Sequence, residues 1–214
     1  MNYHKKIAAP DLVCMNDCAG AYIHIDLAYA REDNHLFGQR IYKADAKLWL
    51  HRDLADIVQF AGQHIHETMG GKIVLYDGLR CVDAQAAMLK TQRVRDNPQW
   101  LEEPRLLSPP GSGAHPRAMA IDVSIMDANG VLLDMGTPFD DLTEKAHRNY
   151  PHSDAVMDNR RLLDEAMIDG ALRCGVEILL LPQEWWDFRL PRAVYEAYAP
   201  LSDADLPREM WLMR

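Results

Sequence analysis

The sequence predicts an α+β fold in which helices pack on a central, mainly antiparallel sheet, within a single domain that spans residues 1–214. Three observations support this fold class. Residues 46–69 and 158–174 carry apolar side chains at the helical spacings of three and four. Residues 119–125 alternate between apolar and small or polar side chains, as in a strand. Asp-Ala-Asn-Gly at 127–130 is a hairpin-turn signal, after which the chain returns antiparallel.

The first half of the chain combines strand and helix patterns, and one predicted strand ends close to two charged side chains. Gly70 and Gly71 end the long helix, because glycine is favoured just past a helix C-terminus. The buried strand that follows delivers Asp77 and Arg80 to its C-terminal end, and Asp83 starts the next helix as a favourable N-cap. The elements expected in this half are a first strand at residues 21–27, a helix at 46–69, a strand at 72–76 and a helix at 83–89.

The second half begins with a loop that is rich in proline and leads to His115. Long loops in compact domains are often functional, so this loop is expected to border a site. Gly175 lies past the end of a second long helix, as a terminating glycine does. The elements expected in this half are a loop at residues 97–113, a strand at 119–125, its return strand at 131–133, a helix at 158–174, a short buried strand at 176–182 and a short helix at 191–198.

The composition indicates an ordinary water-soluble protein and excludes some partners. Apolar residues make up 48% of the chain and charged residues 26%, as in globular domains. A net charge of −9 without a cluster of basic residues argues against a nucleic-acid partner. The four cysteines form no paired metal-ligand pattern, and no stretch is long and apolar enough for a membrane span or a secretory leader. A cytoplasmic protein is expected, and homo-oligomerisation stays open.

His115 and Asp122 are the first candidate metal ligands. Asp122 lies in the middle of a strand that otherwise has the pattern of a core, and a buried, unpaired carboxylate is costly. It therefore needs a cation, a metal ion or several donors beside it. His115 lies seven residues earlier, and the intervening turn can fold its imidazole over the strand. A histidine nitrogen with a carboxylate oxygen suits zinc. The alternative is a satisfied core aspartate and a surface histidine.

Glu184 and Asp187 form the second candidate pair. They lie three residues apart, so one helix-like turn would place both carboxylates on the same side. Trp185 and Trp186 are bulky apolar neighbours, and such surroundings suit a carboxylate whose raised pKa lets it act as a general base and acid. The alternative is an amphipathic turn with two core tryptophans and two solvated acids.

Four segments, in family order, resemble motifs of the D-alanyl-D-alanine dipeptidases, the VanX-type zinc peptidases. Two family blocks read Ser-x-His-x-x-Gly-x-Ala-x-Asp and Glu-x-Trp-His. The residues that match them at the right spacing are His115, Ala120, Asp122, Glu184 and Trp186. Residues 76–80 resemble the segment with the family's catalytic arginine. Residues 135–140 resemble the segment whose aspartate receives the free amino group of the substrate.

The resemblance implies a Hedgehog/D-Ala-D-Ala-type peptidase fold that hydrolyses the dipeptide D-alanyl-D-alanine with a zinc-activated water and one Zn²⁺ per chain. Glu184 would be the general base and acid, and Arg80 would stabilise the tetrahedral intermediate. The implied metal ligands are His115, Asp122 and Asp187. The implied substrate-binding residues are Asp140, with Asp141 as its alternative, Asp77, Tyr29 and Ser112.

The chain also departs from the family motifs. Asp187 stands where the family has its third ligand, a histidine. A set of one nitrogen and two carboxylates is harder and more negative, so it should bind zinc less selectively and admit Mn²⁺ or Mg²⁺ more readily. Gly113 stands in place of the serine, although Ser112 is adjacent, Ala118 replaces the glycine, and Cys81 replaces the usual proline after the arginine.

Two other functions stay open at this point. The chain could be a catalytically weakened or inactive relative that binds D-amino-acid peptides without cutting them. It could also be a D,D- or L,D-carboxypeptidase that acts on peptidoglycan peptides. The presence of Glu184 and Arg80 favours an enzyme, whereas Asp187 favours a binding protein.

Overall fold

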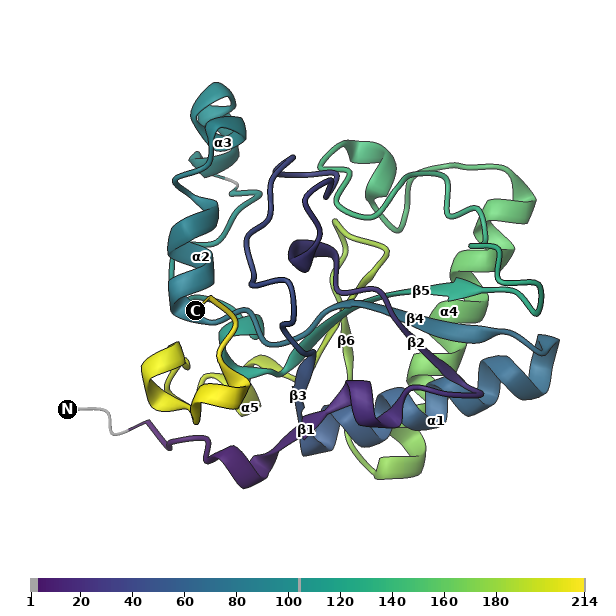
Figure 1. The fold of residues 1–214 in the computed structure, drawn as a ribbon. Coiled ribbons are helices and arrows are strands. Elements are labelled where there is room, and N and C mark those ends of the chain that lie inside the picture. The colour runs from purple at the N-terminus through teal and green to yellow at the C-terminus, as the bar shows by residue number, and fades with distance from the viewer. Residues whose placement is uncertain (1–3, 104, 214) are drawn as a thin grey trace.

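The computed structural model describes residues 4–103 and 105–213 and is built around a mixed sheet (Figure 1). Within these residues the sheet has five strands in the order β2-β4-β5-β7-β6. The strands are β2 (Ile23–Ile25), β4 (Lys72–Asp77), β5 (Ala120–Met126), β7 (Asp187–Arg189) and β6 (Leu179–Leu180). β2 runs parallel to β4, and the other pairings are antiparallel. The α+β fold with a mainly antiparallel sheet is thereby confirmed.

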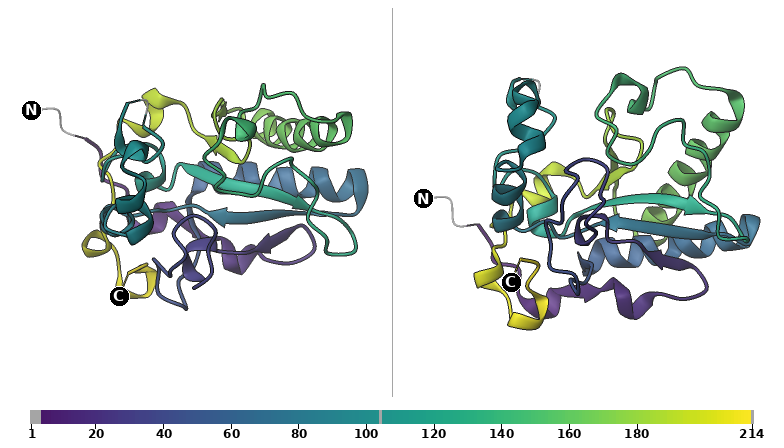
Figure 2. Two further views of the ribbon diagram at one scale, coloured as in Figure 1. Left: turned by 90° about the horizontal axis from the view of Figure 1, so that it is seen from above. Right: turned by 45° about the horizontal axis from the view of Figure 1, so that its top comes forward.

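The helices α1 (Arg52–Met69) and α4 (Asp154–Cys174) lie together on one side of the sheet (Figure 2). The two backbones approach closely at Gly170, where a Cβ atom would lie 2.4 Å from the carbonyl oxygen of Ile57. Gly70 and Gly175 end these helices in the left-handed conformation, as the sequence predicted. The remaining helices and strands are α2 (Val82–Met88), α3 (Gln92–Asp96), α5 (Arg192–Tyr195), and the antiparallel pair β1 (Leu12–Cys14) and β3 (Trp49–His51).

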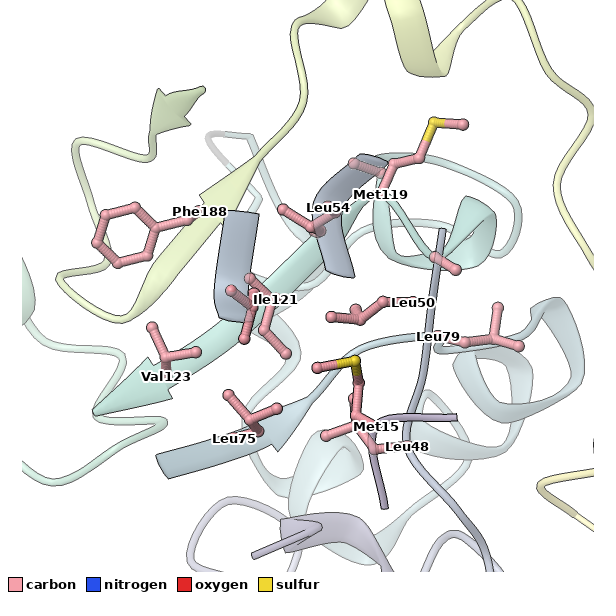
Figure 3. Close-up of a cluster of buried hydrophobic side chains, with 14 of the residues drawn as sticks. Met15, Leu48, Leu50, Leu54, Leu75, Leu79, Met119, Ile121, Val123 and Phe188 are labelled. Carbon is pink, nitrogen blue, oxygen red and sulfur yellow. The ribbon is translucent and has the colours of Figure 1, made fainter. Parts of the chain in front are cut away.

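The core lies between the sheet and these two helices. Ile121 and Val123 of β5 point into it together with Leu75 of β4 and Phe188 of β7, and Leu54 of α1 closes it from the other side (Figure 3). All five side chains are fully buried. Since side chains alternate along a strand, the residues between them face the opposite side of the sheet, where the candidate site lies.

Several predicted element boundaries were wrong. α4 begins at Asp154 and not at residue 158, and α5 covers only Arg192–Tyr195 of the predicted 191–198. The long helix begins at Arg52 and not at residue 46, because Trp49–His51 forms β3 and pairs with β1. The strand expected at 176–182 shrinks to β6, which pairs with β7, and its Leu179 is 42% exposed. The return strand at 131–133 is reduced to a single bridge between Met126 and Leu132.

The predicted cap of α2 was also wrong. Cys81 occupies the N-cap position and makes no capping hydrogen bond with its side chain. The Asp83 carboxylate instead accepts hydrogen bonds from Ser202 Oγ (2.7 Å) and Asp203 N (2.9 Å), so it ties α2 to the C-terminal segment. None of the helices in the described part of the chain has the length and apolar character that crossing a membrane requires.

Candidate active site

Three aspartates lie side by side on neighbouring strands. Asp77 of β4 pairs with Asp122 of β5, and Asp122 pairs with Asp187 of β7. A register shift in β4 between Leu75 and Asp77 brings Asp77 opposite Asp122, because a bulge turns one side chain to the other face. All three carboxylates are buried. Buried carboxylates at this spacing repel one another, so the site requires positive charge.

Arg80 supplies part of that charge. Its Nε atom donates to Asp77 Oδ2 (2.7 Å) and its Nη2 atom to Asp122 Oδ2 (3.1 Å). The hydroxyl of Tyr42 donates to the other Asp77 oxygen (2.8 Å), so both oxygens of Asp77 are engaged. The guanidinium also lies over the ring of Tyr29, 5.2 Å from its centroid. Arg80 is therefore held in one orientation, and Asp77 orients it.

His115 presents one ring nitrogen to the aspartates. Its Nδ1 atom lies 2.8 Å from the carbonyl oxygen of Gly78 and must donate there, because a carbonyl only accepts. In the neutral ring, Nε2 then carries the lone pair, the arrangement that a metal-binding histidine needs. Nε2 lies 3.4 Å from Asp122 Oδ1 and 3.3 Å from Asp187 Oδ2.

Asp122 Oδ1 is the oxygen of this site that most favours a nearby positive charge. It is buried and has no hydrogen-bond partner within residues 4–103 and 105–213, although such an oxygen is costly when unpaired. Burial and Arg80 both lower the pKa of His115, but Asp122 and Asp187 outweigh them and raise it to about 10. The space between these three side chains therefore attracts positive charge, and their nitrogen and oxygen donors fit a divalent metal ion.

Asp187 already has a cationic partner in Arg189. Arg189 Nε donates to Asp187 Oδ1 (2.7 Å) and its Nη2 donates to Asp187 Oδ2. Burial raises the pKa of Asp187, but Arg189 and then His115 reverse this and hold it well below its usual range. The Asp187 Oδ2 atom would thus be shared between a guanidinium and an ion, with its second lone pair left for the ion.

Glu184 lies just before β7, in a turn where the Asp187 N–H approaches the Glu184 carbonyl oxygen at 3.4 Å. A carboxylate oxygen of Glu184 lies within 4.8 Å of one oxygen of Asp122 and of one oxygen of Asp187. Burial first, and then the charges of Asp187 and Asp122, raises the pKa of Glu184 to about 8. Trp185 and Trp186 beside it are buried, as the sequence predicted. A carboxyl group with this pKa can exchange a proton near neutral pH.

A cavity of about 760 Å³ opens onto these residues. Arg80, His115, Glu184, Asp187 and Arg189 line its polar floor. The proline-rich loop supplies a wall from Arg105 to Ser108, so the loop borders the site as the sequence predicted. The arrangement places an imidazole, two carboxylates and two guanidinium groups around one space.

Comparison with known proteins assigns the family. Residues 12–202 match the family model described as D-Ala-D-Ala dipeptidase, of the M15 peptidases. The chain belongs to this peptidase family. It is 32% identical over 185 residues to the D-alanyl-D-alanine dipeptidase of Escherichia coli (strain K12), which covers 85% of this chain and 84% of that protein. A weaker match is the solved Serratia marcescens L-Ala D-Glu endopeptidase ChiX, with 18% identity and a TM-score of 0.41 over 68% of this chain and 84% of that one.

The substrate-side residues predicted for this peptidase lie in two places. Tyr29 is buried beneath Arg80, and its hydroxyl donates to Asp140 Oδ1 (3.1 Å). Asp140 is buried and borders a neighbouring cavity of about 350 Å³, which shares Leu142 with the larger one. Burial and then Asp122 raise the pKa of Asp140 well above its usual range. Ser112 is exposed and lines the larger cavity, where its carbonyl oxygen accepts from Gln85 Nε2 (3.1 Å).

Sequence reasoning missed three polar side chains of this peptidase site. Arg189 has a visible signal, because in a strand residues two apart share a face and Arg189 lies two after Asp187. Tyr42 leaves no such signal, since it reaches Asp77 from a loop 35 residues away. Arg148 donates to the Asp187 carbonyl oxygen (3.0 Å) and so fixes the start of β7.

Proposed function

We propose that this peptidase hydrolyses D-alanyl-D-alanine in a single catalytic domain, residues 1–214, with one divalent ion held by His115, Asp122 and Asp187. Zinc is the first candidate, and the two carboxylates also suit Mn²⁺ or Mg²⁺. One observation carries the proposal: the buried, unpartnered Asp122 Oδ1 lies 3.4 Å from His115 Nε2, whose Nδ1 is fixed by Gly78. Family membership and the dipeptidase relative support the substrate.

A divalent ion in this position would supply a Lewis acid that polarises the scissile carbonyl and acidifies a water molecule. The surrounding chain would do the rest of the chemistry. Glu184, with its pKa near 8, would accept the proton of the attacking water and pass it to the leaving amine. Arg80, already oriented by Asp77, would donate hydrogen bonds to the oxyanion of the tetrahedral intermediate.

Substrate binding would use the other side of Arg80. Asp140 is the better candidate for the ammonium group, since it is buried and joined to the site through Tyr29. Asp141 instead accepts the Thr143 N–H (2.9 Å) within its own turn. An ammonium that meets a buried carboxylate at a fixed distance from the reacting carbonyl would restrict the enzyme to short substrates. Ser112 would contact the peptide at the rim of the cavity.

A second candidate function is recognition of D-amino-acid peptides without hydrolysis. The observation that favours it is the two-point contact of Arg189 with Asp187, the third proposed ligand. If that contact excluded the ion, the cavity would remain but the activated water would not form. A D,D- or L,D-carboxypeptidase would share the metal site and differ in the length of peptide that it accepts.

The test is the metal content of the purified protein, together with D-alanine release from D-alanyl-D-alanine with Zn²⁺, Mn²⁺ or no added metal. We expect about one ion per chain and metal-dependent release. Glu184→Ala should lower turnover by about two to four orders of magnitude and retain the ion, because general base catalysis contributes that much. The matched control is Glu177→Ala, which removes an exposed glutamate. An ion without release would favour another peptide substrate, and absence of any ion would contradict the metal site.

A further inference from the structure

Arg189 is one of the residues that line the larger cavity. It extends from β7 on the same face as Asp187, and the residue opposite it on β5 is the small Ala120. Its side chain is 18% exposed and borders the cavity beside Glu184. A guanidinium that is this enclosed and held at two points has lost most of its freedom, so its contact with Asp187 is a specific feature of the fold.

The two aspartates among the proposed ligands are held differently. Asp122 gives one oxygen to Arg80 and leaves Oδ1 unpartnered within the described residues. Asp187 gives both oxygens to Arg189. An ion can therefore use Asp122 without displacing a contact, whereas at Asp187 it must share Oδ2 with a fixed positive charge.

The charges explain why such a partner is present. The site already contains the carboxylates of Asp77, Asp122 and Glu184, and Asp187 adds one more negative charge. Arg189 returns the sum of the pair to zero. The pair Asp187–Arg189 thus adds no net charge to the site.

We propose that Arg189 is an internal counter-ion that competes with the divalent metal ion for Asp187 and thereby sets the affinity of the site. This counter-ion role rests on the proposed metal site and adds Arg189 to the residues that act there. Arg189 is a positioning residue, because it acts on the ion through Asp187. Without the ion, Arg189 neutralises the buried carboxylate; with the ion, the two cations share it.

The experiment measures Mn²⁺ and Zn²⁺ affinity by calorimetry on the metal-free chain and on Arg189→Met. We expect Arg189→Met to bind Mn²⁺ at least tenfold more tightly, since Asp187 becomes free for the ion. The metal-free variant should melt at a lower temperature than the parent chain, because the buried carboxylate of Asp187 loses its partner. Excess Mn²⁺ should remove this difference in melting temperature. Arg192→Met is the matched control, as Arg192 pairs with Glu196 on the surface.

The effect must depend on Asp187. In an Asp187→His background, the neutral imidazole leaves nothing to compete for, so Arg189→Met should change the Mn²⁺ affinity less than twofold. Arg189→Lys keeps the charge without the two-point contact and should give an intermediate affinity, which also provides a readout if the methionine variant folds poorly. His115→Ala should weaken binding in every background if the ion lies at this site.

The outcomes distinguish a failure of the Arg189 competition from a failure of the proposed metal site. Equal or weaker Mn²⁺ binding by Arg189→Met and Arg189→Lys would overturn the competition, and so would an equal gain in the Asp187→His background. If the parent chain, Arg189→Met and Asp187→His all fail to bind an ion, or His115→Ala binds as well as they do, the metal site itself is wrong. Tight binding by Arg189→Met alone would mean that Arg189 keeps the ion out of the parent chain.

Discussion

At the scale of single residues, the position of a carboxylate's partners decides what the carboxylate can do. Asp77 has both oxygens engaged, by Tyr42 and Arg80, and it orients the guanidinium of Arg80. Asp122 keeps one buried oxygen without a partner in the described chain, and that oxygen faces the imidazole of His115. Asp187 shares both of its oxygens with Arg189, so the three aspartates in one row across the sheet differ in their partners.

The substrate's amino group provides a residue-scale prediction. Asp140→Asn should raise KM for D-alanyl-D-alanine by about tenfold or more, because the ammonium would lose a buried opposite charge. We expect a large change in KM and a small change in kcat, since Asp140 is not among the residues proposed to act on the reacting carbonyl. Initial rates over a range of dipeptide concentrations measure both.

The neighbouring aspartate serves as the control for this prediction. Asp141→Asn should leave KM near that of the parent chain, since Asp141 holds its own turn through Thr143. The parent chain should reject N-acetyl-D-alanyl-D-alanine, and Asp140→Asn should discriminate less. If Asp141→Asn raises KM while Asp140→Asn does not, the assignment of the two aspartates is reversed.

At the scale of elements, the site depends on how closely the segment after β4 approaches β3. Gly78 follows Asp77, and its carbonyl oxygen fixes His115 Nδ1. A Cβ atom at Gly78 would lie 2.7 Å from the Trp49 carbonyl oxygen and under 3 Å from Leu50 and Leu48 side-chain carbons. Any larger residue must therefore push this segment away from β3 and move the acceptor of the histidine.

Gly78→Ala should lower the free energy of unfolding by about 1–3 kcal/mol, the usual cost of overpacking a filled space. Urea denaturation of the metal-free protein measures this. The variant should also bind the ion more weakly, because the carbonyl that orients His115 is displaced. Gly20→Ala is the control, since a Cβ atom there would meet nothing within 4 Å. Unchanged stability in Gly78→Ala would show that the chain relaxes around the added methyl group.

Some strands and their boundaries could be predicted from the sequence, whereas features that depend on strand pairing could not. The strand expected at 119–125 was correct to within one residue, because its alternating apolar side chains face the core. The bulge that turns Asp77 toward Asp122 has no signature in the sequence, since it depends on the pairing of two strands. β3 was missed because three residues that pair with a strand far earlier in the chain continue an apolar helical pattern.

Some contacts of the candidate site could likewise be predicted from the sequence, and others could not. The spacing of His115 and Asp122, combined with the family motif, was enough to predict that they meet, and they do. The contact between Arg189 and Asp187 was missed, because Glu184 and Asp187 were assigned to one helix-like turn, whereas β7 begins at Asp187. Distances between segments such as Tyr42 and Asp77 arise from packing, which local patterns do not contain.

At the scale of the whole molecule, the fold places three aspartates on one face of the sheet. The other face packs against a hydrophobic core, part of which Figure 3 shows. Helices α1 and α4 cover the core side, and the cavity opens on the other side. This division ties the stability of the entire chain to the charge state of the site. A cation, a proton or an arginine must offset the carboxylates, so removing one of these should be measurable as a loss of global stability.

The raised pKa of Glu184 leads to a prediction about how the free energy of unfolding depends on pH. Its pKa is about 8 in the metal-free folded chain, against 4.5 as the ordinary value, so the folded state holds this proton more tightly than the unfolded state. Between these two values, unfolding releases the proton, and the free energy of unfolding must fall as pH rises. One proton contributes a slope of at most about 1.4 kcal/mol per pH unit. Glu184→Gln has no proton to lose and should remove this part of the slope.

The measurement is the difference in unfolding free energy between Glu184→Gln and the parent chain, from urea denaturation at several pH values in a chelating buffer. The difference should grow from pH 5 to pH 8 in favour of the variant and then level off. His115, with its pKa raised to about 10, changes stability in both proteins and largely cancels. Glu177→Gln, at an exposed position, is the matched control. A difference that is constant with pH would mean that Glu184 ionises normally, and Glu184 would then lack the pKa that suits it to proton transfer near neutrality.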